Sequence, residues 1–567
     1  MTKKHIILIL LLSLVSTLLV QWNLTRAILL DDYLKKPNIV YENNDEQYYL
    51  SLISESAKGR GSIGNPFLKE WSEQPYLYVP LNVQFVGFVQ RTLHFDVKAV
   101  SILFDYGAVY ILMMMIFILF ALIFRYHLFG YLGSIGYIFL PRMFDIWKRP
   151  ISPQVNFIPL FVFFYFYFSK ISFWKRELGM AFAVGAMFYT YPYHWTFVLA
   201  FLVLSDAQTF YQNRKILTQY FYKYLVMAII SIGYILNFYY IHNLYYYMES
   251  MGRIGALASR MPAGYYTQAL IVGFLIIYFA MRLFDKTRGM LCNCDTDFNK
   301  IILGLCAGLV VLNQQFVTGM QLEFNTHYLP VILLFVVFYI SALFFILWQN
   351  VIGKNKNIVL VCALILTLSL AIISVRNETR VYPQPFSDKN IPNTFLVYNW
   401  LQKNNITNEI IYAPDDMAND IPIYTGNYVV FSELARLQLM PTSDLFNRFK
   451  YFDITNTTIT NDLIGRQRDV FGIFYTARMQ KDAIRDRIKS LFVNNTIVRK
   501  NISDYIPRDF NNIRMMRQTI SIKDFEKYLD TYNTKYIIYK TSDRNSLYNK
   551  INGSIVFESI EYTIKQR

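Results

Sequence analysis

Long apolar runs decide the fold of this chain, and the first of them, residues 5–22, reads HIILILLLSLVSTLLVQW. A helix needs about 20 apolar residues to cross the hydrocarbon core of a bilayer, and runs of nearly this length recur as far as residue 375. Of the 567 residues, 54% are hydrophobic and only 17% are charged, whereas soluble domains have about 25% charged residues. The sequence therefore predicts a polytopic α-helical membrane protein.

The lengths of the apolar runs predict about eleven transmembrane helices. They lie near residues 5–22, 100–124, 128–141, 155–170, 177–191, 195–211, 220–241, 266–283, 299–316, 329–348 and 357–375. Lys3 and Lys4 favour a cytoplasmic N terminus, and an odd number of spans then places the C-terminal part of the chain outside the cell.

Four parts follow from this count. A first transmembrane helix (1–22) precedes a long extracytoplasmic loop (23–98), a transmembrane bundle (99–375) and an extracytoplasmic domain (376–567). In the last part the apolar runs shrink to strand length, as at residues 410–413, and helical patterns lie between them. This alternation predicts a small α/β domain.

The basic residues follow the expected excess in cytoplasmic loops, except in two predicted outer loops. One of these loops holds Arg142, Lys148 and Arg149, and the other holds Arg253 and Arg260. A site for a lipid phosphate on the outer face would explain them, and so would a misplaced short span. The formal net charge of +16 fits basic loops that meet anionic membrane lipid. No basic-aromatic pattern predicts binding of nucleic acid.

An acidic pair stands in the long loop after the first span, in Asp45-Glu46-Gln47-Tyr48-Tyr49. Two solvated loop carboxylates are the plain interpretation. The pair and its placement also resemble the first-loop Asp-Glu motif of the GT-C glycosyltransferases, which take sugar from a polyprenyl-phosphate carrier. The protein O-mannosyltransferases and the aminoarabinose transferases of lipid A are the most similar types. The predicted layout as a whole is GT-C-like, although the W-W-D-Y-G motif of the oligosaccharyltransferase branch is missing.

The resemblance implies that Asp45 is the general base that takes a proton from the acceptor hydroxyl. Glu46 would orient Asp45 or contact the acceptor. Inverting transfer of a sugar needs such a base, and a carboxylate suits the task when partial removal from water raises its pKa. Tyr48 is a further candidate for contact with sugar or acceptor.

The leaving phosphate gains negative charge, so cations must meet it. Arg149 is the favoured candidate because a proline-bounded turn (150–153) follows it, and Arg142 and Lys148 belong to the same loop. Arg260 is a second choice. Alternatively, these side chains extend from an interface loop to lipid headgroups.

Four other residues are candidates for contact with sugar, phosphate or acceptor. Asp145 resembles the second acidic residue that the family often carries in its second outer loop, unless it pairs with a nearby Arg. If Asp145 and Asp45 share a cavity, a divalent metal becomes conceivable, and no cofactor is assigned. His194 and His327 lie near predicted outer turns, where structural hydrogen bonding is the alternative role. Gln314 predicts a polar cavity or hydrogen bonding between helices.

The sequence therefore predicts an integral glycosyltransferase of the cell membrane. It would move a sugar from a polyprenyl-phosphate carrier to a lipid, polysaccharide or protein acceptor on the outer face. The alternatives are a transporter or flippase, which would favour inverted repeats and charges within spans, and a non-catalytic scaffold. The glycosyltransferase hypothesis, unlike the two alternatives, predicts that Asp45 faces a cavity that also contains Arg149 or Arg260.

Overall fold

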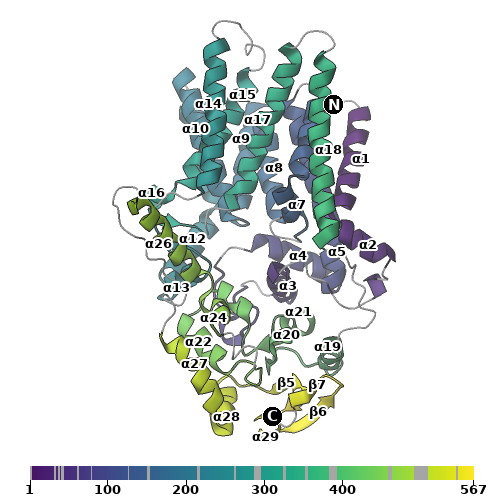
Figure 1. The fold of residues 1–567 in the computed structure, drawn as a ribbon, viewed down its shortest axis with the longest axis vertical. Helices are drawn as coiled ribbons and strands as arrows, with labels where there is room; N and C mark the ends of the chain where they lie inside the picture. The colour runs from purple at the N-terminus through teal and green to yellow at the C-terminus, as the bar shows by residue number, and fades with distance from the viewer. Residues whose placement is uncertain are drawn as a thin grey trace.

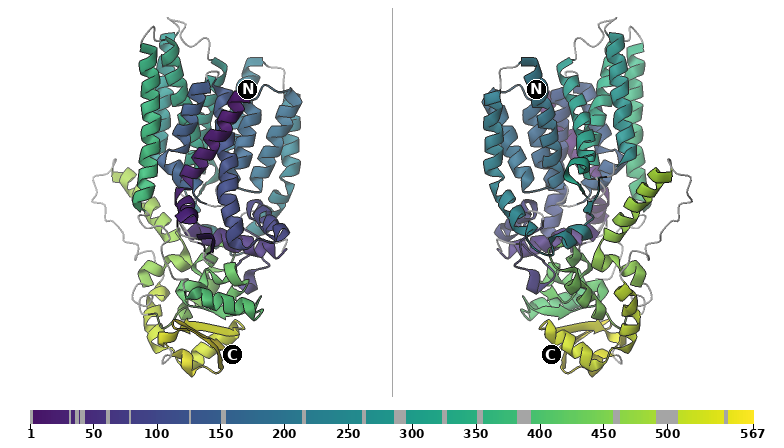
Figure 2. Two further views of the ribbon diagram at one scale, coloured as in Figure 1. Left: turned by 90° about the vertical axis from the view of Figure 1, so that its right-hand side faces the viewer. Right: turned by 90° about the vertical axis from the view of Figure 1, so that its left-hand side faces the viewer.

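The computed structural model describes residues 3–30, 33–35, 39, 44–59, 63–77, 80–124, 127–149, 154–213, 217–260, 264–285, 295–322, 327–350, 355–381, 393–456, 463–490, 508–543 and 547–567. The molecule is elongated, with a bundle of long helices at one end and a smaller α/β region at the other (Figure 1). Short helices form a layer between the two, and Figure 2 shows the same stacking from both sides.

The bundle is made of apolar helices that share one core. They are α1 (Lys3–Val20), α5 (Val97–Ile123), α6 (His127–Ile138), α8 (Gln154–Phe168), α9 (Phe173–Phe188), α10 (Pro192–Asn213), α11 (Leu217–Ile230), α14 (Tyr265–Asp285), α15 (Asp295–Leu312), α17 (Leu329–Asn350) and α18 (Asn355–Val381). Helix α12 (Ile232–His242) follows α11, and its buried Ile241 belongs to a separate cluster. Aromatic rings interlock in the core, where the ring centroids of Phe164, Phe201 and Phe335 lie 5.3–5.8 Å apart. Rings at this spacing add specific packing to the burial of apolar surface.

Among the described residues, six helices are long and apolar enough to cross a membrane, namely α1, α5, α14, α15, α17 and α18. A seventh span results if α11 and α12, which meet at a 55° bend, count as one. The prediction of a helical membrane protein is therefore confirmed. Helices also occupy the remaining predicted spans, but α6, α8 and α9 have only 12, 15 and 16 residues. The count of eleven stays a prediction.

Short elements connect the bundle to the α/β region. They are α2 (Trp22–Leu30), η1 (Tyr33–Lys35), α3 (Asn44–Ala57), η2 (Lys69–Trp71), α4 (Leu81–Leu93), α7 (Pro141–Trp147), α13 (Tyr247–Arg253) and α16 (Gln315–Thr318). Strands β1 (Leu257–Ala258) and β2 (Met320–Gln321) pair antiparallel in the same layer. The N terminus lies at the far end of the bundle (Figure 1). The long first loop and the C-terminal region thus lie at one end of the bundle.

The C-terminal region is built on a five-stranded mixed sheet with the order β4-β3-β5-β7-β6. Strand β3 (Ile410–Tyr412) is parallel to β4 (Tyr428–Val429) and β5 (Tyr536–Lys540), and β7 (Tyr562–Gln566) is antiparallel to β5 and to β6 (Ser554–Glu558). The helices of this region are α19 (Thr394–Lys403), α20 (Asp415–Ala418), α21 (Ile421–Thr425), η4 (Glu433–Leu437), α22 (Thr442–Tyr451), α24 (Leu463–Arg466), α25 (Arg468–Phe471), α26 (Phe474–Ser490), α27 (Arg508–Thr519), α28 (Ile522–Thr531), η6 (Thr541–Asp543) and α29 (Leu547–Lys550).

Local sequence explains where one helix of the bundle, α5, and one helix of the C-terminal region, α28, begin. The side chain of Asp96 accepts a hydrogen bond from the backbone N–H of Ala99 and so caps α5. Helix α28 begins in a capping box, in which Ser521 and Asp524 each bond to the other's backbone N–H. Such caps satisfy donors that the first turn of a helix leaves without partners.

Candidate functional site

The acidic pair lies in the first turn of α3 instead of in an irregular loop. Acidic side chains are favourable there because the N-terminal end of a helix carries partial positive charge. The two carboxylates differ in exposure. The side chain of Asp45 is 57% exposed, whereas Glu46 is only 4% exposed. A helix therefore presents one of the two acids to a ligand and buries the other.

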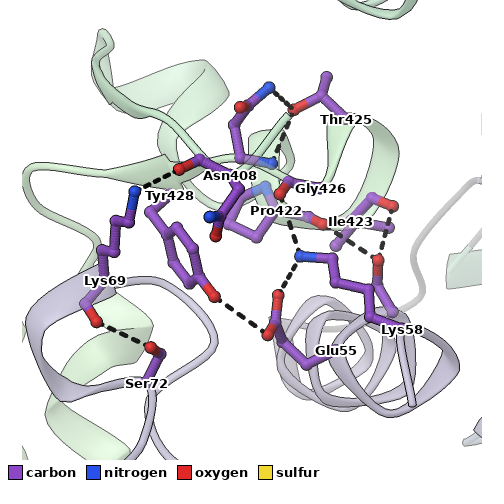
Figure 3. Close-up of polar contacts among 12 residues, drawn as sticks. Glu55, Lys58, Lys69, Ser72, Asn408, Pro422, Ile423, Thr425, Gly426 and Tyr428 are labelled. Atoms are coloured by element: carbon purple, nitrogen blue, oxygen red, sulfur yellow. Dashed lines mark hydrogen bonds and ion pairs between the residues drawn. The ribbon is translucent and has the colours of Figure 1, made fainter. Parts of the chain in front are cut away.

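The C-terminal region holds α3 in place (Figure 3). The Ser54 hydroxyl donates to the carbonyl oxygen of Pro422 at 3.1 Å, and the Lys58 ammonium donates to that of Gly426 at 3.0 Å. The Tyr428 hydroxyl donates to Glu55 at 3.2 Å. These contacts join segments more than 360 residues apart in the sequence, so the position of Asp45 depends on the C-terminal region.

A cavity of about 350 Å³ opens beside Asp45. Its walls come from α3, the start of α4, α7, the α9–α10 turn, the end of α13, the segment that leads into α17, and η4. Ligand pockets in proteins have volumes of about 300–1,000 Å³. The bundle, the first loop and the C-terminal region thus all contribute to one cavity of ligand size.

An ion pair lies in the wall of this cavity. Arg149 Nη1 is 3.0 Å from Asp45 Oδ2. Arg149 directly follows the short helix α7 and Lys148, and its side chain is 35% exposed. The 150–153 turn that was expected to fix it lies outside the described residues. A guanidinium has five N–H donors, so Arg149 can bond Asp45 and an anionic ligand together.

Five of the residues predicted for the site line this cavity: Asp45, Tyr48, Arg142, Arg149 and His327. They come from three separate segments of the chain, namely α3, the 141–149 segment with α7, and the segment that leads into α17. The fold therefore brings together carboxylate, guanidinium, imidazole and phenol groups in one place.

Aromatic residues hold His327 at the cavity wall. Its Nδ1 is hydrogen-bonded to the Tyr191 hydroxyl, and its ring stacks on Tyr193 with a centroid distance of 4.5 Å. Tyr191 and Tyr193 also line the cavity. Flat rings beside polar groups suit contact with a sugar, which has both apolar and hydroxyl-bearing surfaces.

Tyr48 connects the acidic motif to the C-terminal region. Its hydroxyl accepts a hydrogen bond from Gln438 Nε2 at 2.8 Å. Burial raises the pKa of Tyr48 well above its usual value, and the nearby Tyr49 and Asp45 add to this effect. Tyr48 is therefore neutral at physiological pH, and its O–H remains a donor for a ligand.

The other predicted residues do not line the cavity: Glu46, Asp145, Lys148, His194, Arg260 and Gln314. Lys148 is buried and lies 3.7 Å from the exposed Asp145. Asp145 thus pairs with a cation of its own loop and does not share the cavity with Asp45. Across the described ranges, no group of three or more His, Cys, Asp or Glu side chains is arranged to hold a metal ion.

His194 is fully buried beside the cavity. Its Nδ1 is 3.0 Å from the carbonyl oxygen of Asn156, and its ring packs against Phe157 at 4.5 Å. Gln314 donates to the carbonyl oxygen of Met320 at 2.8 Å. The contacts of His194 are structural, which is the alternative given for this residue, whereas the bond of Gln314 stays within the segment that runs from the end of α15 into β2 and does not join two helices.

Sequence reasoning missed the wall that the C-terminal region contributes. Leu434, Arg436 and Leu437 of η4 line the cavity, as does Ile473. Arg253 also lines it, and burial lowers the pKa of this guanidinium to about 10. The place of Arg253 in a predicted outer loop that breaks the positive-inside pattern was a signal for this residue. No sequence pattern in η4 distinguishes Arg436 from a surface arginine. Arg436 and Asp45 are also far apart in the sequence, so the sequence does not indicate that both line one cavity.

The exposure of Asp45 differs from the expectation of a partly desolvated base. More than half of its side chain is exposed.

No protein-family profile matches this chain, and no curated protein matches it either. The function of the protein is therefore inferred from the residues of the cavity.

Proposed function

We propose that this protein is a membrane glycosyltransferase that moves a sugar from a polyprenyl-phosphate carrier to an acceptor hydroxyl, with Asp45 as general base. One observation carries the proposal: Asp45 and Arg149 meet at 3.0 Å in the wall of a ligand-sized cavity at one end of the bundle. A transferase of this type needs a base and a phosphate-binding cation in the same cavity.

In the proposed reaction the acceptor oxygen attacks the anomeric carbon while the bond from that carbon to the carrier phosphate breaks. The electron pair of the broken bond goes to the phosphate oxygen, and the acceptor proton goes to Asp45. The products are a glycoside and the free polyprenyl phosphate. Arg149 and Arg142 would bind the phosphate as its charge grows, because preformed cations in a cavity stabilise developing charge.

The remaining wall supports binding of a sugar between these groups. Tyr48 and His327 offer polar atoms, and Tyr191 and Tyr193 offer ring faces. Together with the cations, they form a site for a ligand with one anionic and one hydroxyl-rich part. The proposal includes a lipid, a polysaccharide or a protein as the acceptor.

A second candidate, transport, is favoured by a buried charge cluster in the bundle. Lys223 Nζ lies 3.3 Å from Glu177 and 2.8 Å from Asp206. Ionisable groups within apolar helices often mark transport pathways. Glu177 lies near the start of α9, however, whereas the cavity residue Thr190 follows the end of that helix. The cluster and the cavity therefore lie near opposite ends of α9.

The deciding experiment measures transfer of radiolabelled sugar from polyprenyl-phosphate donors in membranes that contain wild type or Asp45→Asn. We expect the variant to fold and to lose at least about 100-fold in rate, because general base catalysis contributes roughly 10²–10⁴-fold. Asp145→Asn is the matched control, since Asp145 is an exposed carboxylate outside the cavity wall. Normal transfer by Asp45→Asn would exclude Asp45 as the base. Uptake of label without a new product would favour transport.

A further inference from the structure

Positive charge exceeds negative charge in the wall of the cavity. Four arginines line it, namely Arg142, Arg149, Arg253 and Arg436, whereas Asp45 is the single acidic residue in the wall that the structure describes. The negative charge of Asp45 balances the positive charge of one of the four arginines, Arg149. The guanidinium of Arg253 donates to five protein groups. Arg142 and Arg436 thus lack an acidic partner among the lining residues, although Glu433, which does not line the cavity, lies 4.0 Å from Arg436. The two arginines stand on different elements.

Arg436 belongs to the part of the wall that η4 supplies. Leu434 and Leu437 of the same turn also line the cavity. Burial lowers the pKa of Arg436, and the carboxylates of Glu433, Asp469 and Asp45 act against this effect. An arginine stays charged even so. The charge of Arg436 is therefore close enough to interact with Asp45, although Arg436 comes from the C-terminal region.

The backbone and neighbouring side chains keep Arg436 in position. Its Nη1 donates to the carbonyl oxygen of Glu433, and the Glu433 carboxylate lies 4.0 Å away. Asn419 donates to this carboxylate at 3.3 Å and accepts from Ser432 at 2.6 Å. Within the described part of the chain, the guanidinium of Arg436 makes no other hydrogen bond. Most of its N–H groups thus remain for a ligand.

We propose that Arg436 forms a second anion-binding subsite, separate from the one at Arg142 and Arg149. This inference rests on the proposed function and adds that the bound ligands carry a second anionic group. That group is either the distal phosphate of a diphosphate-linked carrier or an acidic group on the acceptor. In both cases the C-terminal region contributes a binding residue to the site and is more than a support for α3.

Binding measurements on the full-length protein in nanodiscs test this subsite. The probes are farnesyl phosphate, farnesyl diphosphate, and inorganic phosphate added with or without farnesyl phosphate. The proteins are wild type, Arg436→Gln, Arg149→Gln and the control Arg478→Gln, which removes an exposed charge of α26 outside the cavity. Arg436→Lys, which keeps the charge but loses the forked geometry, covers the case that Arg436→Gln does not fold.

We expect Arg149→Gln to weaken both farnesyl ligands, and Arg478→Gln to weaken neither. Arg436→Gln should leave binding of farnesyl phosphate unchanged. It should weaken binding of farnesyl diphosphate about tenfold if the second group is on the carrier, or binding of inorganic phosphate beside farnesyl phosphate if it is on the acceptor. Either pattern supports the subsite.

Two results would overturn it. One is unchanged binding of every probe by Arg436→Gln, and the other is equal weakening of farnesyl phosphate and farnesyl diphosphate, which would place Arg436 in the first subsite. The carrier proposal fails separately if wild type binds inorganic phosphate through Arg436 but neither farnesyl ligand. Wild type that binds none of the anions would contradict both proposals.

Discussion

Two arginines in the cavity wall contrast sharply in their surroundings. Arg149 stands just after α7, is 35% exposed and has one ion pair, to Asp45. Arg253 ends α13, is 2% exposed, and donates to the carbonyl oxygens of Arg436, Gln438 and Met440 and to two hydroxyl groups. Both residues lie in predicted outer loops, but the guanidinium of Arg253 donates to five protein groups, whereas that of Arg149 donates to Asp45 alone among the described residues.

This difference shows that lining a cavity is not enough to assign a binding role. Arg253 joins α13 to the segment after η4, and the chain after α25 approaches the backbone of Arg253 closely. Gly472 has a positive φ of 59°, and a Cβ at this position would lie 1.9 Å from the carbonyl oxygen of Arg253. The tight approach places the next residue, Ile473, in hydrogen-bond contact with that carbonyl at 2.9 Å. Arg253 therefore builds the wall, whereas Arg149 is the arginine that the proposed function assigns to the ligand.

The largest expected effect is on stability and concerns Arg253→Ala. This change leaves several buried carbonyl groups without their donor, and hydrogen bonds to charged groups contribute about 1.5–3 kcal/mol each. We expect a loss of at least about 3 kcal/mol in the free energy of unfolding, seen as a lower melting temperature of the purified protein. Limited proteolysis should cut the C-terminal region earlier than in wild type.

The matched change is Arg149→Ala, which should leave the melting temperature nearly unchanged, because exposed ion pairs contribute only about 0–1 kcal/mol. An equal loss of stability in both variants would remove the distinction between a structural and a ligand-facing arginine.

The next largest effect concerns the carrier. Arg149→Gln keeps a polar side chain of similar length but removes the charge, so under the proposed function the carrier phosphate would lose a charge-assisted partner. We expect roughly a tenfold or greater rise in KM for the polyprenyl-phosphate donor, with little change in KM for the acceptor. Steady-state transfer assays with each substrate varied in turn measure both values. An equal rise in both would indicate that Arg149 shapes the cavity as a whole.

How far the sequence predicted this architecture depends on the range of the interactions involved. Apolar length locates helices locally, and the strand-length run expected at residues 410–413 is strand β3. Asp45 and Arg149 meet because their two segments lie at the same end of the bundle. The excess of basic residues in one predicted outer loop indicated this arrangement. The place of Arg436 in the cavity wall could not be predicted from the sequence. It depends on side-chain contacts between α3 and the C-terminal region, such as the one between Gln47 and Asp420 at 2.8 Å.

The smallest effect separates a ligand contact from a positioning role at Tyr48. Gln438→Ala removes the donor to the Tyr48 hydroxyl, and Tyr48→Phe removes the hydroxyl itself. One neutral hydrogen bond contributes about 0.5–1.5 kcal/mol, so each variant should lose roughly two- to tenfold in kcat/KM. If the hydroxyl only connects α3 to the C-terminal region, the double variant loses no more than either single one, because both remove the same bond.

The split between kcat and KM sharpens this test. A positioning role predicts that kcat falls in both variants, since Asp45 is one helical turn from Tyr48 and moves with it. A direct bond from the Tyr48 hydroxyl to the sugar predicts that Tyr48→Phe also raises KM, while Gln438→Ala does not. The buried, neutral state of Tyr48 keeps its proton in place at physiological pH. Any KM effect of Tyr48→Phe should therefore be constant between about pH 6 and pH 9, well below the ordinary pKa of a tyrosine. A KM effect that appears only at the alkaline end of this range would contradict both roles.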